Sequence, residues 1–177
     1  MKFTGRKAPG KLEEYLMKSF RGRKKRHLLI TGSKGIGKTT LLKEILKGYD
    51  NFGGIITYVR RDIEGFPETV ILKDILDSNK SAIIGKRINN VMTPIVEGFE
   101  GQGLEILKKY NSSTKDTIVI DEIGFLELDA INYQTEILRT FKNKDTIVVL
   151  RKGNNYFINK IVRHDNTFLV DLDEYTL

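Results

Sequence analysis

The sequence predicts an α/β protein whose sheet is mainly parallel. Apolar runs alternate along the chain with stretches in which apolar residues recur at helical spacing, as in parallel strands joined by helices. These apolar runs do not alternate with polar residues, so both faces of the strands are expected to be buried. Residues 53–85 instead carry consecutive β-rich segments, which predict an antiparallel β insertion in the same sheet.

The individual elements follow from apolar spacing and from turn-forming residues. Strands are predicted over residues 27–31, 55–59, 69–72, 81–84, 117–120, 146–150 and 168–170. Helices are predicted over residues 39–47, 104–110, 130–141 and 156–162. The turn-forming residues 64–67 should join the first two strands of the insertion as a hairpin or meander, and the glycine-rich residues 98–103 should lead into the next helix.

The chain is expected to form one domain over residues 27–177, because its length suits a single domain and no linker or internal repeat divides it. Residues 1–26 are interpreted as a basic N-terminal extension. An apolar stripe at helical spacing predicts a short helix within this extension; it consists of Leu12, Tyr15, Leu16 and Phe20.

Composition and charge limit the classes of function. Hydrophobic residues make up 40% of the chain and charged residues 30%, as in globular proteins. No apolar run approaches the ~18 residues needed to span a bilayer, the amino terminus lacks a secretory signal, and there is no cysteine. We therefore expect a cytoplasmic protein without a membrane partner, and we expect it to be a monomer.

The net charge of +7 is confined to the start of the chain. Residues 1–27 hold ten Lys or Arg against two acids, a net of 10 − 2 = +8, whereas the remainder holds 20 bases and 21 acids, a net of −1. A polyanion running across the whole domain is therefore not indicated. The densest run, residues 21–26, could bind nucleic acid or an acidic protein partner, or it could be a solvated basic arm.

Residues 32–39 match the phosphate-loop pattern G-x-x-x-x-G-K-[ST] between a predicted strand and a predicted helix. Glycines in this pattern let backbone N–H groups turn toward phosphate oxygens at the positive end of the helix. We expect Lys38 to reach the β- and γ-phosphates, the Thr39 hydroxyl to bind Mg²⁺ and Thr40 to touch the α-phosphate. The alternative is a glycine-rich turn with an exposed lysine. The predicted nucleotide-binding residues are Gly32, Ser33, Lys34, Gly35, Ile36, Gly37, Lys38, Thr39 and Thr40.

A second predicted strand ends on an acidic pair. In phosphate-loop enzymes a strand beside the first commonly ends on an aspartate that holds Mg²⁺, and Asp121 fits this position. A carboxylate directly after it, Glu122, can accept a proton from the attacking water, which favours hydrolysis over transfer to an acceptor. The alternative is an acidic pair that only begins a loop.

A positive charge on the γ-phosphate would stabilise the transition state of phosphoryl transfer. Arg151 is the best internal candidate, because it ends the strand after the acidic pair and should lie at the same edge of the sheet. Arg60, Arg61 and Arg87 in the β insertion are alternatives, and each arginine could instead be a solvated surface charge.

Three stretches resemble the small nucleoside-triphosphatases of the THEP type, the family that includes the cancer-related nucleoside-triphosphatase. They are TGSKGIGKTTL at residues 31–41, GGIITYVR at 53–60 and IDEIGFLEL at 120–128, and weaker similarity extends the likeness over residues 27–170. The resemblance implies a RecA-like three-layer sandwich, Mg²⁺ dependence and hydrolysis of several nucleoside triphosphates, ATP and GTP among them.

Two positions depart from the family pattern. The family usually carries a lysine where Phe125 stands, and an Asn-Arg pair near the last strand where this chain reads Asp173-Glu174-Tyr175. The departures leave base contacts, rate and substrate range open.

Two other functions remain possible from the sequence. The first is a nucleotide-dependent switch or adaptor that binds a partner through its basic arm. The second is a small nucleotide or small-molecule kinase, against which Glu122 and the lack of a clustered arginine lid both count.

Overall fold

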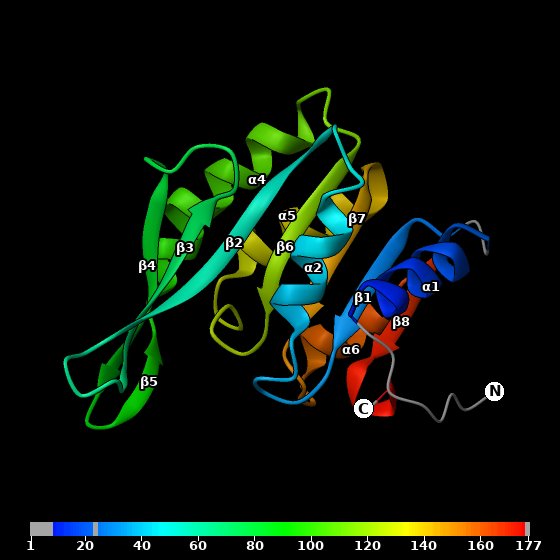
Figure 1. The fold of residues 1–177 in the computed structure, drawn as a ribbon. Helices are drawn as coiled ribbons and strands as arrows, with labels where there is room; N and C mark the ends of the chain where they lie inside the picture. The colour runs from blue at the N-terminus through cyan, green and yellow to red at the C-terminus, as the bar shows by residue number, and fades with distance from the viewer. Residues whose placement is uncertain (1–8, 23–24, 176–177) are drawn as a thin grey trace.

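The computed structural model describes residues 9–22 and 25–175, which fold around one eight-stranded sheet (Figure 1). The strands are β1 (His27–Thr31), β2 (Phe52–Arg61), β3 (Pro67–Asp74), β4 (Ser81–Ile88), β5 (Val91–Pro94), β6 (Thr117–Ile123), β7 (Asp145–Leu150) and β8 (Thr167–Asp171). The helices are α1 (Pro9–Gly22), α2 (Lys38–Leu46), α3 (Val96–Gly98), α4 (Leu104–Asn111), α5 (Ile131–Asn143) and α6 (Tyr156–Val162). A π-helical turn, η1 (Phe99–Gly103), joins α3 to α4, and a 3-10 turn, η2 (Leu172–Tyr175), follows β8.

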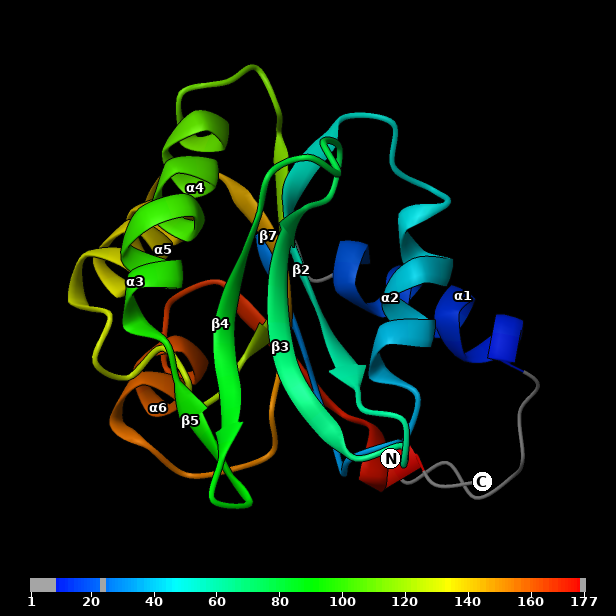
Figure 2. The same cartoon turned by 90° about the vertical axis from the view of Figure 1, so that its left-hand side faces the viewer.

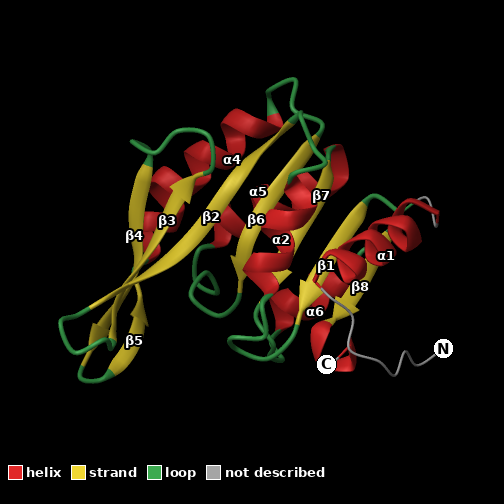
Figure 3. Cartoon of the chain, viewed as in Figure 1, coloured by secondary structure: helices red, strands yellow, loops and turns green. Residues whose placement is uncertain are grey.

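The strand order of the sheet is β5-β4-β3-β2-β6-β7-β1-β8 (Figure 3). The five strands from β2 to β8 in this order pair in parallel, whereas β3, β4 and β5 are added antiparallel at the β2 edge. The predicted fold class, a mainly parallel sheet with an antiparallel insertion, is confirmed. One detail was wrong: the acidic pair was expected on the strand beside β1, but β7 lies between β1 and β6. All three strands are similar apolar runs, so the sequence carries no signal for their order.

Helices cover both faces of the parallel part of the sheet, which gives three layers (Figure 2). On one face lie α1 and α2, and on the other lie α4, α5 and α6. Successive residues of β1 point into different layers: Leu28 and Ile30 pack toward α1 and α2, and Leu29 packs toward the opposite helices. Full burial of each such side chain contributes roughly 1.5–3 kcal/mol. This two-sided burial explains why the strand sequences are apolar throughout.

The glycine-rich residues 98–103, expected to precede a helix, are themselves helical and join α3 to α4 through η1. Close packing explains the first and the last of these glycines. A Cβ at Gly98 would lie 2.1 Å from the Ile83 carbonyl oxygen, and one at Gly103 would lie 3.1 Å from the Tyr133 ring. Gly98 and Gly103 therefore mark close approaches to β4 and α5.

The first helix, α1, packs onto α2 and the β1 side of the sheet. Leu16, Met17 and Phe20 are buried in one cluster with residues of α2 and β1, and the Phe20 ring lies 6.2 Å from that of Phe168. The boundary predicted at residue 26 stays a prediction. None of the described helices is both long and apolar enough to cross a bilayer.

Within the basic run, residues 23 and 24 lie outside the described residues. Arg26 follows them, and its Nε forms an ion pair with Asp145 Oδ1 at 2.9 Å.

Candidate active site

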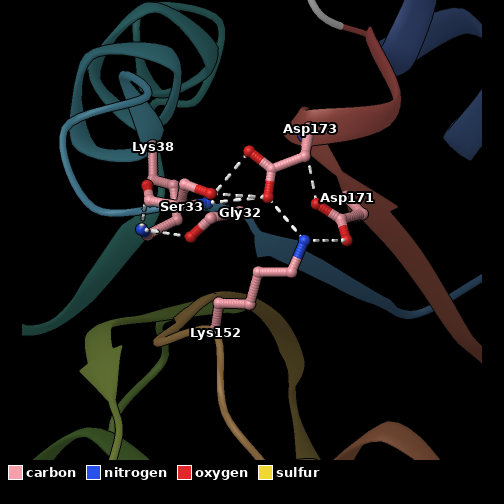
Figure 4. Close-up of polar contacts among 6 residues, drawn as sticks. All are labelled: Gly32, Ser33, Lys38, Lys152, Asp171 and Asp173. Atoms are coloured by element: carbon pink, nitrogen blue, oxygen red, sulfur yellow. Dashed lines mark hydrogen bonds and ion pairs between the residues drawn. The ribbon is translucent and has the colours of Figure 1, made fainter.

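The phosphate-loop residues 32–39 connect the carboxyl end of β1 to the first residues of α2. Gly35 and Gly37 have φ angles of +83° and +103°, a left-handed conformation that favours glycine. Lys38 is buried, and its Nζ donates hydrogen bonds to the carbonyl oxygens of Gly32 at 2.8 Å and Ser33 at 3.2 Å. The ammonium group therefore lies over the backbone of its own loop (Figure 4).

Thr39 and Asp121 meet at the end of the sheet even though β7 separates their strands. The Thr39 hydroxyl donates to Asp121 Oδ2 at 3.1 Å. Asp121 is 3% exposed, and this burial raises its pKa to about 6; the Glu122 charge acts in the same direction, whereas the Thr39 hydrogen bond and two lysines oppose it. A hydroxyl and a carboxylate are the oxygen ligands that Mg²⁺ takes beside phosphates and water, so this pair fits that ion.

Glu122 follows Asp121 on β6, which continues to Ile123 instead of stopping at the acidic pair as expected. The peptide bond between Asp121 and Glu122 is cis, and the pairing with β7 is irregular between Asp121 and Ile123. The Glu122 side chain is partly exposed and faces the same cavity as the phosphate loop.

One cavity of about 660 Å³ brings most of the predicted site residues together. Its lining includes Gly32, Lys34, Gly35, Gly37, Lys38, Thr39, Thr40, Asp121, Glu122 and Arg151. Two predicted nucleotide-binding residues do not line it. These are Ile36 and Ser33, and the N–H and hydroxyl groups of Ser33 are both directed to the Asp173 carboxylate.

Arg151 follows β7, so the unexpected strand order puts it between the phosphate loop and the acidic pair. Its N–H donates to the Ile123 carbonyl at 2.8 Å, and its guanidinium lies 4.7 Å from the centre of the Phe125 ring. A Cβ at Gly124 would come within 3.2 Å of Arg151 Cδ. Phe125, one of the two departures from the family pattern, therefore supports the arginine through a cation–π contact.

The three alternative arginines lie in the β insertion and do not line the cavity. Arg60 pairs with Glu68, Arg87 pairs with Asp62, and Arg61 donates to the Gly65 carbonyl.

Sequence reasoning missed Glu127 as a residue of the site. Its side chain is 2% exposed, lines the cavity and accepts a hydrogen bond from the Gly124 N–H at 2.7 Å. Burial raises its pKa to about 7, and the nearby charge of Glu122 adds to this. The only signal was its position within the similar stretch at residues 120–128.

Lys152 and Asp173 were also missed. Lys152 lines the cavity next to Arg151 and pairs with Asp171 and Asp173. The sequence marked Asp173 only as a departure from the family pattern. Among the described residues, no group of three or more His, Cys, Asp or Glu side chains could hold a metal ion.

Comparison with known proteins adds to this geometry. A family model described as NTPase matches residues 27–176. Nucleoside-triphosphatase THEP1 from Thermotoga maritima is 30% identical over 158 residues, which cover 83% of this chain and 86% of that protein. The protein of the same name from Thermotoga sp. strain RQ2 is 30% identical over 156 residues, with the same shares of each chain. The crystal structure of THEP1 from the hyperthermophile Aquifex aeolicus, 24% identical, matches with a TM-score of 0.67 over 82% of this chain and 89% of that chain, which supports the fold.

Proposed function

We propose roles for the residues of the cavity from the premise that the chain belongs to the NTPase family and is a nucleoside-triphosphatase, as its sequence predicted. The enzyme converts a nucleoside triphosphate to the diphosphate and phosphate. The observation that carries the assignment is that Lys38, Thr39, Asp121, Glu122 and Arg151 all line one cavity.

The phosphate loop holds the triphosphate. Lys38 Nζ is hydrogen-bonded to the Gly32 and Ser33 carbonyl oxygens, which keeps it at the loop whose amides are proposed to bind the phosphate oxygens with it. Thr40, exposed at the start of α2, is assigned to the α-phosphate.

Thr39 and Asp121 are proposed to hold Mg²⁺. When bound, the ion neutralises charge on the phosphate oxygens. The hydrogen bond of 3.1 Å between the two side chains supports the assignment, because it brings both oxygens to one point. The raised pKa of Asp121 supports it as well, since a buried carboxylate gains most from a cation beside it.

Glu122 is proposed to activate the water. The water oxygen forms a bond to the γ-phosphorus, the bond from that phosphorus to the β–γ bridging oxygen breaks, and the water proton goes to the Glu122 carboxylate. Arg151, held by the Phe125 ring, supplies positive charge to the γ-phosphate oxygens as that charge develops.

Several properties stay proposals that rest on the sequence. They are turnover of several nucleoside triphosphates including ATP and GTP, a cytoplasmic location, a monomeric state, and contact of residues 21–26 with nucleic acid or an acidic protein. Phosphate release with and without single-stranded nucleic acid, on the full chain and on a variant with the basic residues 21–26 neutralised, tests the last of these.

The assignment of the metal ligands is tested by phosphate release from ATP at increasing Mg²⁺ concentration. We expect Asp121→Asn and Thr39→Val to need at least about tenfold more Mg²⁺ for half-maximal rate, the scale of losing one charged or hydroxyl ligand. Thr135→Val, on the exposed face of α5, is the matched control and should behave as wild type. Wild-type Mg²⁺ dependence in both site variants would refute the assignment.

A further inference from the structure

A carboxylate from the far end of the chain holds the first turn of the phosphate loop. Asp173 lies in η2, 140 residues from Ser33. The Ser33 N–H donates to Asp173 Oδ1 and Oδ2 at 3.1 and 3.0 Å, and the Ser33 hydroxyl donates to Oδ2 at 2.9 Å. One side chain therefore accepts hydrogen bonds from both donors of Ser33 (Figure 4).

Lys152 links this carboxylate to the segment after β7 that also carries Arg151. Its Nζ donates to Asp173 Oδ2 and, at 3.0 Å, to Asp171 Oδ2. The Asp173 N–H donates in turn to Asp171 Oδ1 at 3.1 Å. Because β7 and β8 flank β1 on opposite sides, these contacts cross the end of β1 where the phosphate loop begins.

We propose that Asp173 and Lys152 are positioning residues for triphosphate binding, and that together they hold the first turn of the phosphate loop in the shape that receives the phosphates. We call this pair, with its contacts to Ser33 and Asp171, the loop latch. The inference rests on the proposed function, because it gives the latch a role at the same nucleotide site.

The latch acts on Lys38 through Ser33. The Ser33 N–H and hydroxyl are held by Asp173, and the Ser33 carbonyl accepts a hydrogen bond from Lys38 Nζ at 3.2 Å. Loss of the Asp173 carboxylate therefore frees Ser33, and the carbonyl oxygen of Ser33 is a hydrogen-bond acceptor for the Lys38 ammonium. A loop that must be ordered during binding costs affinity, and a loop held beforehand avoids that cost.

The charges of the latch suit this role. The hydrogen bond from Lys152 is the largest cause that lowers the pKa of Asp173 to about 2, so the carboxylate is ionised at neutral pH. Lys152 lies between the carboxylates of Asp171 and Asp173. Without this cation, two negative charges would stand unbalanced beside the site of the triphosphate, and repulsion would weaken binding further.

The resemblance implies an Asn-Arg pair where this chain reads Asp173-Glu174-Tyr175. A direct contact between Asp173 and the base of the nucleotide is therefore the alternative role. The two roles differ in base dependence. A latch acts on the phosphate loop, so its loss should weaken every nucleoside triphosphate by the same factor. A base contact should affect ATP and GTP unequally, because the two bases present different donors and acceptors.

The test is fluorescence titration of the full chain with N-methylanthraniloyl-ATP and Mg²⁺, followed by displacement with unlabelled ATP, GTP, CTP and UTP. We expect Asp173→Ala to weaken all four by about tenfold, the scale of one charge-assisted hydrogen bond, and Lys152→Met to weaken all four as well. Lys152→Arg keeps the charge and should remain within about twofold of wild type. At saturating ATP, kcat should change by less than about threefold in each variant, because the latch serves binding.

The matched control is Asp145→Ala, which breaks the exposed Arg26–Asp145 ion pair at the opposite end of β1 and β7. This variant should bind all four triphosphates as wild type does. Thermal unfolding checks that each protein is folded. If Asp173→Ala does not fold, the two single variants Asp173→Asn and Lys152→Met are used for the test instead.

Unchanged affinity in folded Asp173 and Lys152 variants overturns the latch. Unequal losses of affinity for ATP and GTP overturn it in favour of a contact with the base. A fall in the kcat of Lys152→Met at unchanged affinity overturns it in favour of Lys152 acting on the γ-phosphate. Binding is read from probe fluorescence and not from phosphate release, so a failed role for Glu122 would leave this result intact. Wild-type protein that binds no triphosphate would reject the proposed function itself.

Discussion

The buried carboxyl group of Glu127 gives a quantitative test of the electrostatics of the cavity. Burial raises its pKa from 4.5 to about 7. The native state therefore holds the proton more tightly than the unfolded state does. The stability that this protonation contributes is fully present below pH 4.5 and is lost as the pH rises through about 7.

The magnitude follows from the shift of the pKa. The pKa rises by about 2.5, from 4.5 to about 7, and at about 1.4 kcal/mol for each pH unit the buried charge costs about 3.5 kcal/mol of unfolding free energy above neutral pH. Glu127→Gln carries no charge at any pH, so it lacks this loss. Its amide can still accept the Gly124 hydrogen bond through Oε1, and any misfit of the amide nitrogen adds an offset that does not depend on pH.

The assay is urea unfolding of both proteins without Mg²⁺ at several pH values. We expect the unfolding free energy of Glu127→Gln minus that of wild type to increase by about 2–3 kcal/mol between about pH 5 and pH 8. His27 and Asp121 also have shifted pKa values, but they are present in both proteins and cancel in the difference. A difference that does not change with pH, or one that decreases as the pH rises, would refute the reasoning.

Three further predictions concern the core and the arginine. Burial lowers the pKa of His27 from 6.5 to about 4, so its contribution to stability is present above pH 6.5 and is lost as the pH falls toward 4. In urea unfolding, wild type should lose about 2 kcal/mol of unfolding free energy relative to His27→Gln between about pH 7 and pH 5. Unfolding free energies that change in parallel with pH in the two proteins would contradict this. Gly98→Ala places a Cβ 2.1 Å from the Ile83 carbonyl oxygen and should lower the unfolding free energy by about 2 kcal/mol or more, measured by thermal unfolding against the open position Gly101→Ala. Phe125→Leu removes the ring under Arg151 and should lower kcat about three- to tenfold with little change in KM; an unchanged kcat would remove the ring from the mechanism.

The phosphate loop and the acidic pair could be predicted because their chemistry is local in sequence. The loop needs glycines, a lysine and a hydroxyl at fixed spacing between a strand and a helix, and residues 32–39 supply all of them. Asp121 and Glu122 could be placed because a buried strand precedes them.

Features that depend on which segments meet in space could not be predicted. The apolar runs of β6 and β7 do not reveal that β7 lies beside β1, although this order puts Arg151 next to the phosphate loop. The contact between Ser33 and Asp173 joins the two ends of the domain and has no local pattern. Likewise, the sequence predicts only that the glycines at residues 98–103 lead into a helix, and the close packing of Gly98 and Gly103 depends on segments that meet in the fold.

The proposed mechanism depends on one assignment, that the Glu122 carboxylate activates the water. The direct measurement is the rate of phosphate release from Mg²⁺-ATP at saturation by wild type, by Glu122→Gln and by Glu97→Gln, an exposed glutamate of α3 as the matched control. Glu122→Gln should bind ATP as tightly as wild type but release phosphate at least about 100-fold more slowly, the contribution of a general base. A Glu122→Gln rate within about threefold of wild type would contradict the mechanism.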